Sequence, residues 1–171
     1  MADPTHKSSM HERNIHREGY DMAALSAAFP ALSEHIVMSQ AGTSTVNFAD
    51  QRAVLTLNQA ILVHHYGIEG WNLPEGYLCP PVPGRADYIH YVADLLAASN
   101  RGAIPEGIST RVLDIGVGAN AIYPIVGRKS YGWSFTGSDI DEQALQTAGN
   151  IIQRNELLQE HVNLKLQKNA S

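Results

Sequence analysis

VLDIGVGANAIYP, residues 112–124, decides the fold of this chain, because an apolar run passes directly into an acid and two closely spaced glycines. The apolar residues of 112–115 are typical of a buried parallel strand, and the turn from Asp114 to Gly118 leaves the carboxyl end of that strand. A Cβ at Gly116 or Gly118 would obstruct a ligand or forbid the required φ. We therefore predict that this turn is a ligand-binding loop.

A second strand and a second acid follow at the spacing of a nucleotide-binding fold. Residues 133–136 lead into Asp139, which lies about 20 residues beyond Gly116, where an acid can accept both ribose hydroxyls. Apolar residues at helical spacing predict a helix over 141–158, and residues 162–166 predict a third strand. This order of elements predicts half of a Rossmann-like α/β sheet.

Two classes of cofactor bind this layout, and they differ in charge. Dinucleotides bring a pyrophosphate to a helix N-terminus, whereas S-adenosylmethionine brings a sulfonium and no phosphate. Here Asp114 lies close to where a pyrophosphate would be, and Asn120 stands where the dinucleotide fingerprint has its third glycine. We therefore favour S-adenosylmethionine. An NAD-dependent oxidoreductase is kept as an alternative, although no Tyr-Lys pair for hydride chemistry is evident.

The composition is that of an ordinary soluble globular chain. Its 171 residues are enough for one core, and it is 44% apolar and 17% charged. The single cysteine, Cys79, excludes an internal disulfide framework, and no apolar run approaches the length of a membrane span. The first residues lack a hydrophobic signal core, so we expect a cytoplasmic protein, or a nuclear one if the source is eukaryotic.

The first seventeen residues carry a positive bias, although the net charge of the chain is −5. Lys7, Arg13 and Arg17 supply this bias, with histidines between them. A net negative charge argues against indiscriminate binding of nucleic acid but does not exclude a local basic arm. Composition alone favours a polar tail here.

The region between this arm and the sheet is predicted to be helical. An Asp-initiated amphipathic stretch covers residues 20–28, and apolar residues recur at helical spacing over 51–66. Adjacent residues do not share a helical face, so His64 and His65 do not predict a metal site. His90 is expected on a helix surface or at a cap.

A proline-rich stretch at residues 78–84 is predicted to be extended and rigid, with a new helix beginning near Arg85 and ending around residue 100. A cation at a helix start is unfavourable for the helix dipole. Two interpretations of Arg85 stay open. It binds a ligand anion such as the cofactor carboxylate, or it is a surface residue paired with Asp87 or Asp94.

Five blocks of the sequence resemble successive blocks of one family. The chain is similar to the bacterial ribosomal large-subunit RNA adenine-N6 methyltransferase F family, and that family is similar to the eukaryotic methyltransferase-like protein 16 group. The blocks are MHERNIH at 10–16, NFAD at 47–50, CPPVPGRADYIHYVADLL at 79–96, LDIGVGANAIYP at 113–124 and YGWSFTGSDID at 131–141. Together they cover nearly the whole chain, from about residue 10 to 167.

The resemblance implies a class I S-adenosylmethionine-dependent methyltransferase sheet, incomplete here and preceded by an N-terminal helical region. The implied reaction transfers a methyl group to N6 of an adenine in a structured RNA, either ribosomal RNA or, in eukaryotes, U6-type small nuclear RNA. Arg85 matches a family arginine near the methionine carboxylate, Gly116 and Asn120 match positions that line the cofactor, and Asp139 matches the ribose-binding acid. Neither a membrane nor a metal is implied.

The resemblance also changes the interpretation of the N-terminal arm. Residues 10–17 match a basic, RNA-contacting segment of the family, so we predict that the arm binds RNA, with its basic side chains on the phosphates. The residues that we expect to contact the RNA are Lys7, His11, Arg13, Asn14 and Arg17.

The acceptor motif of the family, Asn-Pro-Pro-Phe, does not occur in the 171 residues, so we assign no catalytic residue. We expect an RNA-contacting arm at 1–19, a helical region at 20–105 and the first half of a methyltransferase domain at 106–171. In the usual strand order of such sheets, the strand at 112–115 would then be an exposed apolar edge. We therefore expect an N-terminal fragment, a truncated gene model or a short isoform, with a non-catalytic RNA-binding module as the alternative.

Overall fold

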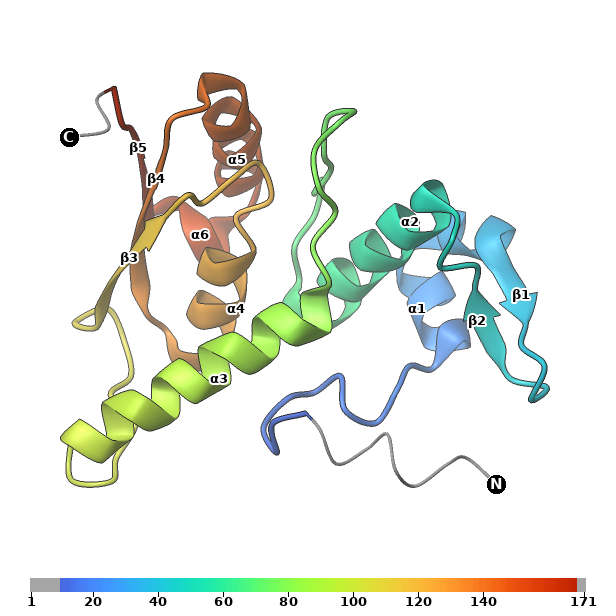
Figure 1. Ribbon diagram of the computed structural model, residues 1–171, viewed down its shortest axis with the longest axis horizontal. Helices are drawn as coiled ribbons and strands as arrows, with labels where there is room; N and C mark the ends of the chain where they lie inside the picture. Colours follow the sequence, from blue (N-terminus) through green and yellow to red (C-terminus); the bar gives the residue numbers. More distant parts are fainter. Residues whose placement is uncertain (1–9, 169–171) are drawn as a thin grey trace.

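The structure is a computed structural model that describes residues 10–168. Figure 1 shows a helical half and a sheet half, and the long helix α3 (Val82–Ser99) begins between them and runs beneath the sheet half. No helix of residues 10–168 is both long and apolar enough to cross a bilayer. Lys7 lies outside the described residues, as does the rest of the predicted arm before residue 10.

The helical half contains the two helices predicted over 20–28 and 51–66 and two elements that were not predicted. Helix α1 (Met22–Ala28) begins after Asp21, whose carboxylate accepts from two backbone N–H groups of the first turn. Helix α2 (Gln51–Ile61) continues into a π-helical turn, η2 (Leu62–Tyr66), so the predicted helix over 51–66 is confirmed. Between them lie the 3-10 helix η1 (Pro30–His35) and an antiparallel hairpin of β1 (Ile36–Met38) and β2 (Ser44–Val46). The region over 20–105 that was predicted to be helical thus also contains a short hairpin.

Helix α3 begins three residues before the predicted start at Arg85. The extended proline-rich segment ends at Pro81, and Pro83 occupies the first helical turn. Proline is tolerated there because the first N–H groups of a helix have no intrahelical acceptor to bond. Arg85 therefore lies in the first turn of the helix, with its backbone N–H donating to Pro81 O.

The sheet half has the predicted order of elements. It consists of β3 (Arg111–Ile115), α4 (Ile122–Tyr131), β4 (Ser134–Asp139), α5 (Glu142–Arg154), α6 (Glu156–Gln159) and β5 (Val162–Leu166). The strands are parallel in the order β3-β4-β5, with Val112 opposite Phe135 and Phe135 opposite Val162. This is the half Rossmann-like sheet that the sequence predicts, with β3 at its edge.

The helices of the sheet half all cover one face of the sheet (Figure 1). On that face Phe135 and Val162 are buried against the helices. On the other face Leu113 is 62% exposed and Ile115 is 75% exposed. The expectation of a buried strand over 112–115 was therefore wrong, because β3 has a neighbour on one side only and no described element packs on its second face.

One hydrophobic core runs through both halves. It includes Leu25 and Ile61 of the helical half, Ile89 of α3, and Trp133 and Phe135 of the sheet half. Helix α4 lies so close to β4 that a Cβ at position 127 would come within 2.4 Å of the Phe135 ring. The predicted boundary near residue 105 stays a prediction.

Candidate cofactor-binding site

The glycine loop leaves the carboxyl end of β3 in a conformation that needs its glycines. Gly116 has φ 81° and Gly118 has φ 65°, which is the left-handed region that side chains with a Cβ rarely adopt. The N–H groups of Gly116 and Val117 both donate to Ser138 O, at 2.8 and 3.0 Å, and tie the loop to β4. Apart from Gly116 and its two chain neighbours, no atom of residues 10–168 lies within 4 Å of where a Cβ of Gly116 would be. The loop therefore presents bare backbone to open space, as a close-fitting ligand requires.

Asp139, the acid at the end of β4, contacts the loop directly. Its Oδ2 accepts from the Gly118 N–H at 2.9 Å, and its Oδ1 accepts from the Asp141 N–H at 3.0 Å. Each carboxylate oxygen keeps a further lone pair after these bonds. The structure thus brings together two residues, Gly118 and Asp139, that the sequence predicted to share one site.

Asp114 is the most unusual acid of the site. Its Oδ2 is buried and accepts a hydrogen bond from none of the described residues. Burial, and secondly the charge of Asp139, raise the pKa of Asp114 to about 6. A half-buried carboxyl beside a second carboxylate favours a cationic or hydrogen-bond-donating ligand and disfavours a phosphate.

Asn120 supports the loop from within. Its side-chain oxygen accepts from the Ile122 N–H at 3.0 Å at the start of α4, across Ala121, a non-glycine residue with φ 48°. Its backbone carbonyl accepts from the Trp71 indole N–H at 2.8 Å. The predicted contact of Asn120 with a cofactor stays a prediction, and the structure adds a helix-capping role.

Arg85 reaches α4, the helix that follows the glycine loop. Its Nη1 donates to the Tyr123 hydroxyl at 2.8 Å, and its Cζ lies 5.6 Å from the centre of the Tyr123 ring. The alternative pairing with Asp87 or Asp94 is not what the structure shows, because both of those acids are bound to the N-terminal segment. Arg85 is held at the loop side of α3 with guanidinium N–H groups left for an anion.

Comparison with known proteins places this geometry in a family. Residues 4–171 match the sequence profile of a family described as RNA methyltransferase. The chain belongs to this RNA methyltransferase family. It is similar to the ribosomal RNA large subunit methyltransferase F of Dechloromonas aromatica, with 58% identity over 92% of this chain and 46% of that protein. The same-named protein of Marinomonas sp. is 51% identical over 98% of this chain and 51% of its own length, so the chain spans about half of these relatives.

Solved structures of the METTL16 methyltransferase (MTase) domain share the fold. The METTL16 MTase domain matches with a TM-score of 0.82 and 29% identity, over 95% of this chain and 62% of that chain. The N-terminal domain of human METTL16 in complex with SAH matches with the same TM-score and identity, over 95% of this chain and 61% of that chain. The human METTL16 catalytic domain in complex with MAT2A 3'UTR hairpin 6 matches with a TM-score of 0.79, over 94% of this chain and 54% of that chain. The family and fold resemblances drawn from the sequence blocks are thereby confirmed.

The N-terminal segment of this RNA methyltransferase family member is bound to α3. The His11 Nε2 lies 2.8 Å from Asp94 Oδ2, and its Nδ1 accepts from the Arg13 N–H at 3.0 Å. The backbone N–H of His11 donates to Asp87 at 3.0 Å. The Asn14 side chain is 1% exposed and donates to Asp87 and to Pro83 O. Two of the predicted RNA contacts therefore have their side chains occupied inside the fold.

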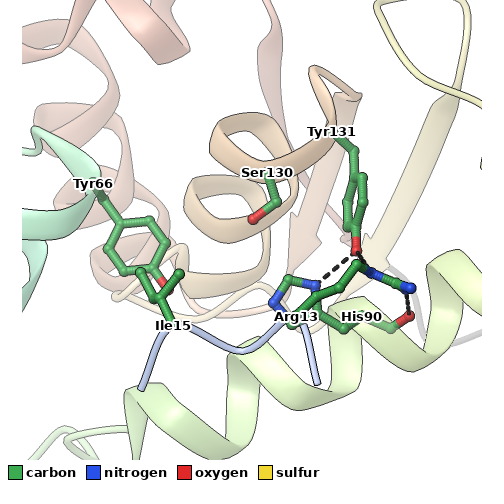
Figure 2. Close-up of a pocket in the computed structure, with 6 residues that line it drawn as sticks. All are labelled: Arg13, Ile15, Tyr66, His90, Ser130 and Tyr131. Carbon is green, nitrogen blue, oxygen red and sulfur yellow. Dashed lines mark hydrogen bonds between the residues drawn. The ribbon is translucent and has the colours of Figure 1, made fainter. Parts of the chain in front are cut away.

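Arg13 and Arg17 differ in how much of the guanidinium is engaged. Arg13 Nη2 donates to Asp94 at 2.5 Å and to His90 O at 3.1 Å, while its Nε donates to the Tyr131 hydroxyl at 3.0 Å. Figure 2 shows Arg13 and His90 converging on Tyr131 at one end of a cavity of about 240 Å³. Arg17 is half-buried, and among the described residues its guanidinium donates to the nearby Glu12 carbonyl alone, at 3.4 Å. The RNA-contacting role stays a prediction, and Arg17 is the described residue that retains most capacity for it.

We expected His90 on a helix surface or at a cap, and this expectation was wrong. It is 5% exposed, and its Nδ1 is 2.7 Å from the Tyr131 hydroxyl. Burial, followed by the nearby His11 and Arg13, lowers the pKa of His90 to about 4. The apolar positions around it on α3 could have signalled this burial, since 86, 89 and 93 are all buried on the same face.

One segment of the site was missed by the sequence analysis. Residues 67–81, here named the strap, connect η2 to α3 and stand between the two halves (Figure 1). Trp71 binds the glycine loop, and the Tyr77 hydroxyl donates to Asp141 Oδ2 at 2.5 Å. The strap also lines a groove of about 850 Å³ against the first turns of α2. The sequence feature that could have indicated this segment is the presence of aromatic residues in a stretch rich in glycine and proline.

Proposed function

We propose that this chain binds S-adenosylmethionine at the carboxyl ends of β3 and β4. The observation that carries the proposal is the contact between Asp139 Oδ2 and the Gly118 N–H, which joins the ribose-binding acid to the positive-φ loop. The residues that we assign to the cofactor are Arg85, Asp114, Gly116, Gly118, Asn120 and Asp139.

The charges of the site support this cofactor over a dinucleotide. Asp114 and Asp139 are close enough for one charge to raise the pKa of the other carboxyl. A ligand with a sulfonium and an amino group would relieve that repulsion, whereas a pyrophosphate would add to it. The human METTL16 domain solved with SAH supports the same assignment at 29% identity.

Each assigned residue has a distinct task in the proposed site. Asp139 accepts the ribose hydroxyls with its remaining lone pairs, and Arg85 binds the methionine carboxylate. The bare backbone at Gly116 allows close approach, and Asp114 accepts from a donor on the cofactor. The bound cofactor supplies an activated methyl group, so the protein needs to orient the acceptor and no protein nucleophile is required.

The acceptor that we propose is N6 of an adenine in a structured RNA. The names of the curated relatives, which specify large-subunit ribosomal RNA, and the RNA hairpin bound to human METTL16 support RNA as the substrate class. The motif that holds the adenine amine in this family, Asn-Pro-Pro-Phe, does not occur in these 171 residues. We therefore assign cofactor binding to this chain, and methyl transfer to a protein that carries the acceptor motif as well.

Isothermal titration with S-adenosylmethionine, its demethylated product and NAD tests the cofactor assignment. We expect the first two to bind, NAD not to bind, and Asp139→Asn to weaken binding about tenfold or more through loss of a charged acceptor. Glu160→Gln, at an exposed position beyond α6, is the matched control. A chain that unfolds cooperatively but binds NAD instead, or neither methyl-cofactor ligand, would overturn the proposal.

A further inference from the structure

The strap is attached to the sheet half at three points. Near its start, the Glu69 N–H and carbonyl are both bonded to the Asn155 side chain, at 2.8 and 3.0 Å. In its middle, the Trp71 indole N–H donates to Asn120 O. Near its end, the Tyr77 hydroxyl donates to Asp141 Oδ2. The strap thus follows the rim of the sheet from the glycine loop to the start of α5.

Two of these attachments fall on either side of the proposed cofactor site. Asn120 belongs to the glycine loop, and Asp141 follows Asp139 by two residues and donates its N–H to that acid. Hydrogen bonds therefore run without a break from Gly118 through Asp139 and Asp141 to Tyr77. The Tyr77 hydroxyl is the end of this series that belongs to the strap.

The two aromatic attachments differ in how firmly they are held. Trp71 is 2% exposed and is part of the core, so breaking its bond to the loop would disturb core packing. Tyr77 is half-buried, lines the groove, and is followed by Leu78, which is 76% exposed. The hydrogen bond with Asp141 raises the pKa of Tyr77 and lowers that of Asp141, as expected of a phenol donating to a carboxylate. This is the attachment that can open while the core stays intact.

We propose that Tyr77 is a positioning residue for the cofactor, and that its hydroxyl fastens the strap to Asp141 as a wall beside the Asp139 end of the cofactor site. This inference rests on the proposed binding of S-adenosylmethionine. Asp141 Oδ1 meanwhile accepts from the N–H groups of Gln143 and Ala144, so the same carboxylate fixes the start of α5 and holds the strap. Losing the hydroxyl frees the end of the strap without removing the helix cap or any loop residue.

The test compares Tyr77→Phe with the unaltered 171-residue chain and with Tyr91→Phe. Tyr91 is an exposed tyrosine of α3 whose hydroxyl has no hydrogen-bond partner among the described residues, so its variant controls for removing a hydroxyl. Stopped-flow dissociation and titration with S-adenosylmethionine measure the cofactor. Amide hydrogen exchange without cofactor measures opening of residues 74–80, and thermal unfolding measures global stability.

We expect Tyr77→Phe to speed cofactor dissociation and raise its Kd by about tenfold, the usual effect of losing a hydrogen bond to a charged group. Exchange in residues 74–80 should become faster, with the unfolding midpoint close to that of Tyr91→Phe. Unchanged dissociation and exchange in Tyr77→Phe, with normal binding by the unaltered chain, would overturn this inference alone. Failure of the unaltered chain to bind would instead overturn the proposed function, and this inference with it.

Discussion

At Gly116, an added Cβ has two effects that can be measured separately. It strains the backbone, and it occupies space that a bound ligand would need. The φ of 81° makes Gly116→Ala strained, at a cost of about 1 kcal/mol, but the added Cβ contacts none of the described residues beyond its chain neighbours. We expect that variant to fold and to lose most cofactor binding by titration. Gly42→Ala in the β1–β2 loop, with φ 75° and equally open space, carries the same strain and should bind normally. Equal binding by both variants would remove Gly116 from the site.

Asp114 gives a stability prediction with a definite sign. Its pKa is raised to about 6 from an ordinary 3.8, so the folded chain holds this proton more tightly than the unfolded chain does. The free energy of unfolding therefore falls as the pH rises from about 4 to about 6, and stays lowered above that. Asp114→Asn should be about 1 kcal/mol more stable at pH 7.5, after allowance for partial exposure, and no more stable at pH 4. Urea unfolding at the two pH values measures this, and weaker cofactor binding should accompany the gain.

Local sequence predicted the residues whose role depends on backbone conformation and strand order. Gly116, Gly118 and Asp139 follow from the turn after one strand and the acid after the next, because neighbouring parallel strands end at one edge. The partners of Arg85 and Tyr77 did not follow, since Tyr123 and Asp141 meet them only through tertiary packing. The burial of Asn14 was missed for the same reason, because a polar, charged segment gives no sign of the helix against which it packs.

At the scale of elements, the contact between residues 10–20 and η2 is expected to loosen in acid. His16 is buried, with Nε2 2.8 Å from the Tyr66 hydroxyl and Nδ1 3.0 Å from the Tyr20 hydroxyl. Burial, and then the neighbouring His65, lower the pKa of His16 to about 4, below the ordinary 6.5. Its contribution to stability is therefore complete above about pH 6.5 and is lost as the pH falls towards 4.

Replacement of His16 tests this pH dependence. Between pH 7 and pH 5 the unaltered chain should lose stability, and His16→Gln, which keeps a donor and an acceptor, should lose about 1 to 2 kcal/mol less over that range. Urea unfolding at the two pH values gives the comparison, and His161→Gln in the sheet half is the control. The same drop in the unaltered chain and in His16→Gln would contradict a buried, neutral His16.

The elements that the sequence missed are those without a strong local pattern. The strands of the β1–β2 hairpin are three residues each, too short for an alternating pattern to stand out, and the start of α3 was hidden by prolines. Pro83 was read as extending the loop, but in the first turn of a helix it removes only an N–H that has no partner there. Long amphipathic helices such as α5 were predicted, because their buried face repeats over several turns.

For the whole molecule, the sheet has one covered face and one open face, and the open face is not uniform. Opposite Leu113 lies Thr136 of β4, and opposite Ile115 lies Ser138, which is followed by Lys165 of β5. Apolar exposure on this face is thus concentrated on β3, which is also an edge with unpaired backbone groups on one side. The sequence predicted this edge from the strand order of the fold, but not that its second face would lie open.

An exposed edge of this kind favours pairing with another strand, and a second copy of the chain is always present in a purified sample. We expect the 171-residue chain to self-associate as its concentration rises, in a manner little changed by salt because the contact is apolar. Ile115→Lys, at 75% exposure, should suppress this association in sedimentation velocity without lowering stability by more than about 0.5 kcal/mol. Val37→Lys on β1, also exposed, is the matched control and should associate as the unaltered chain does. If the unaltered chain remains monomeric throughout, or both variants behave alike, the β3 edge is not the contact surface.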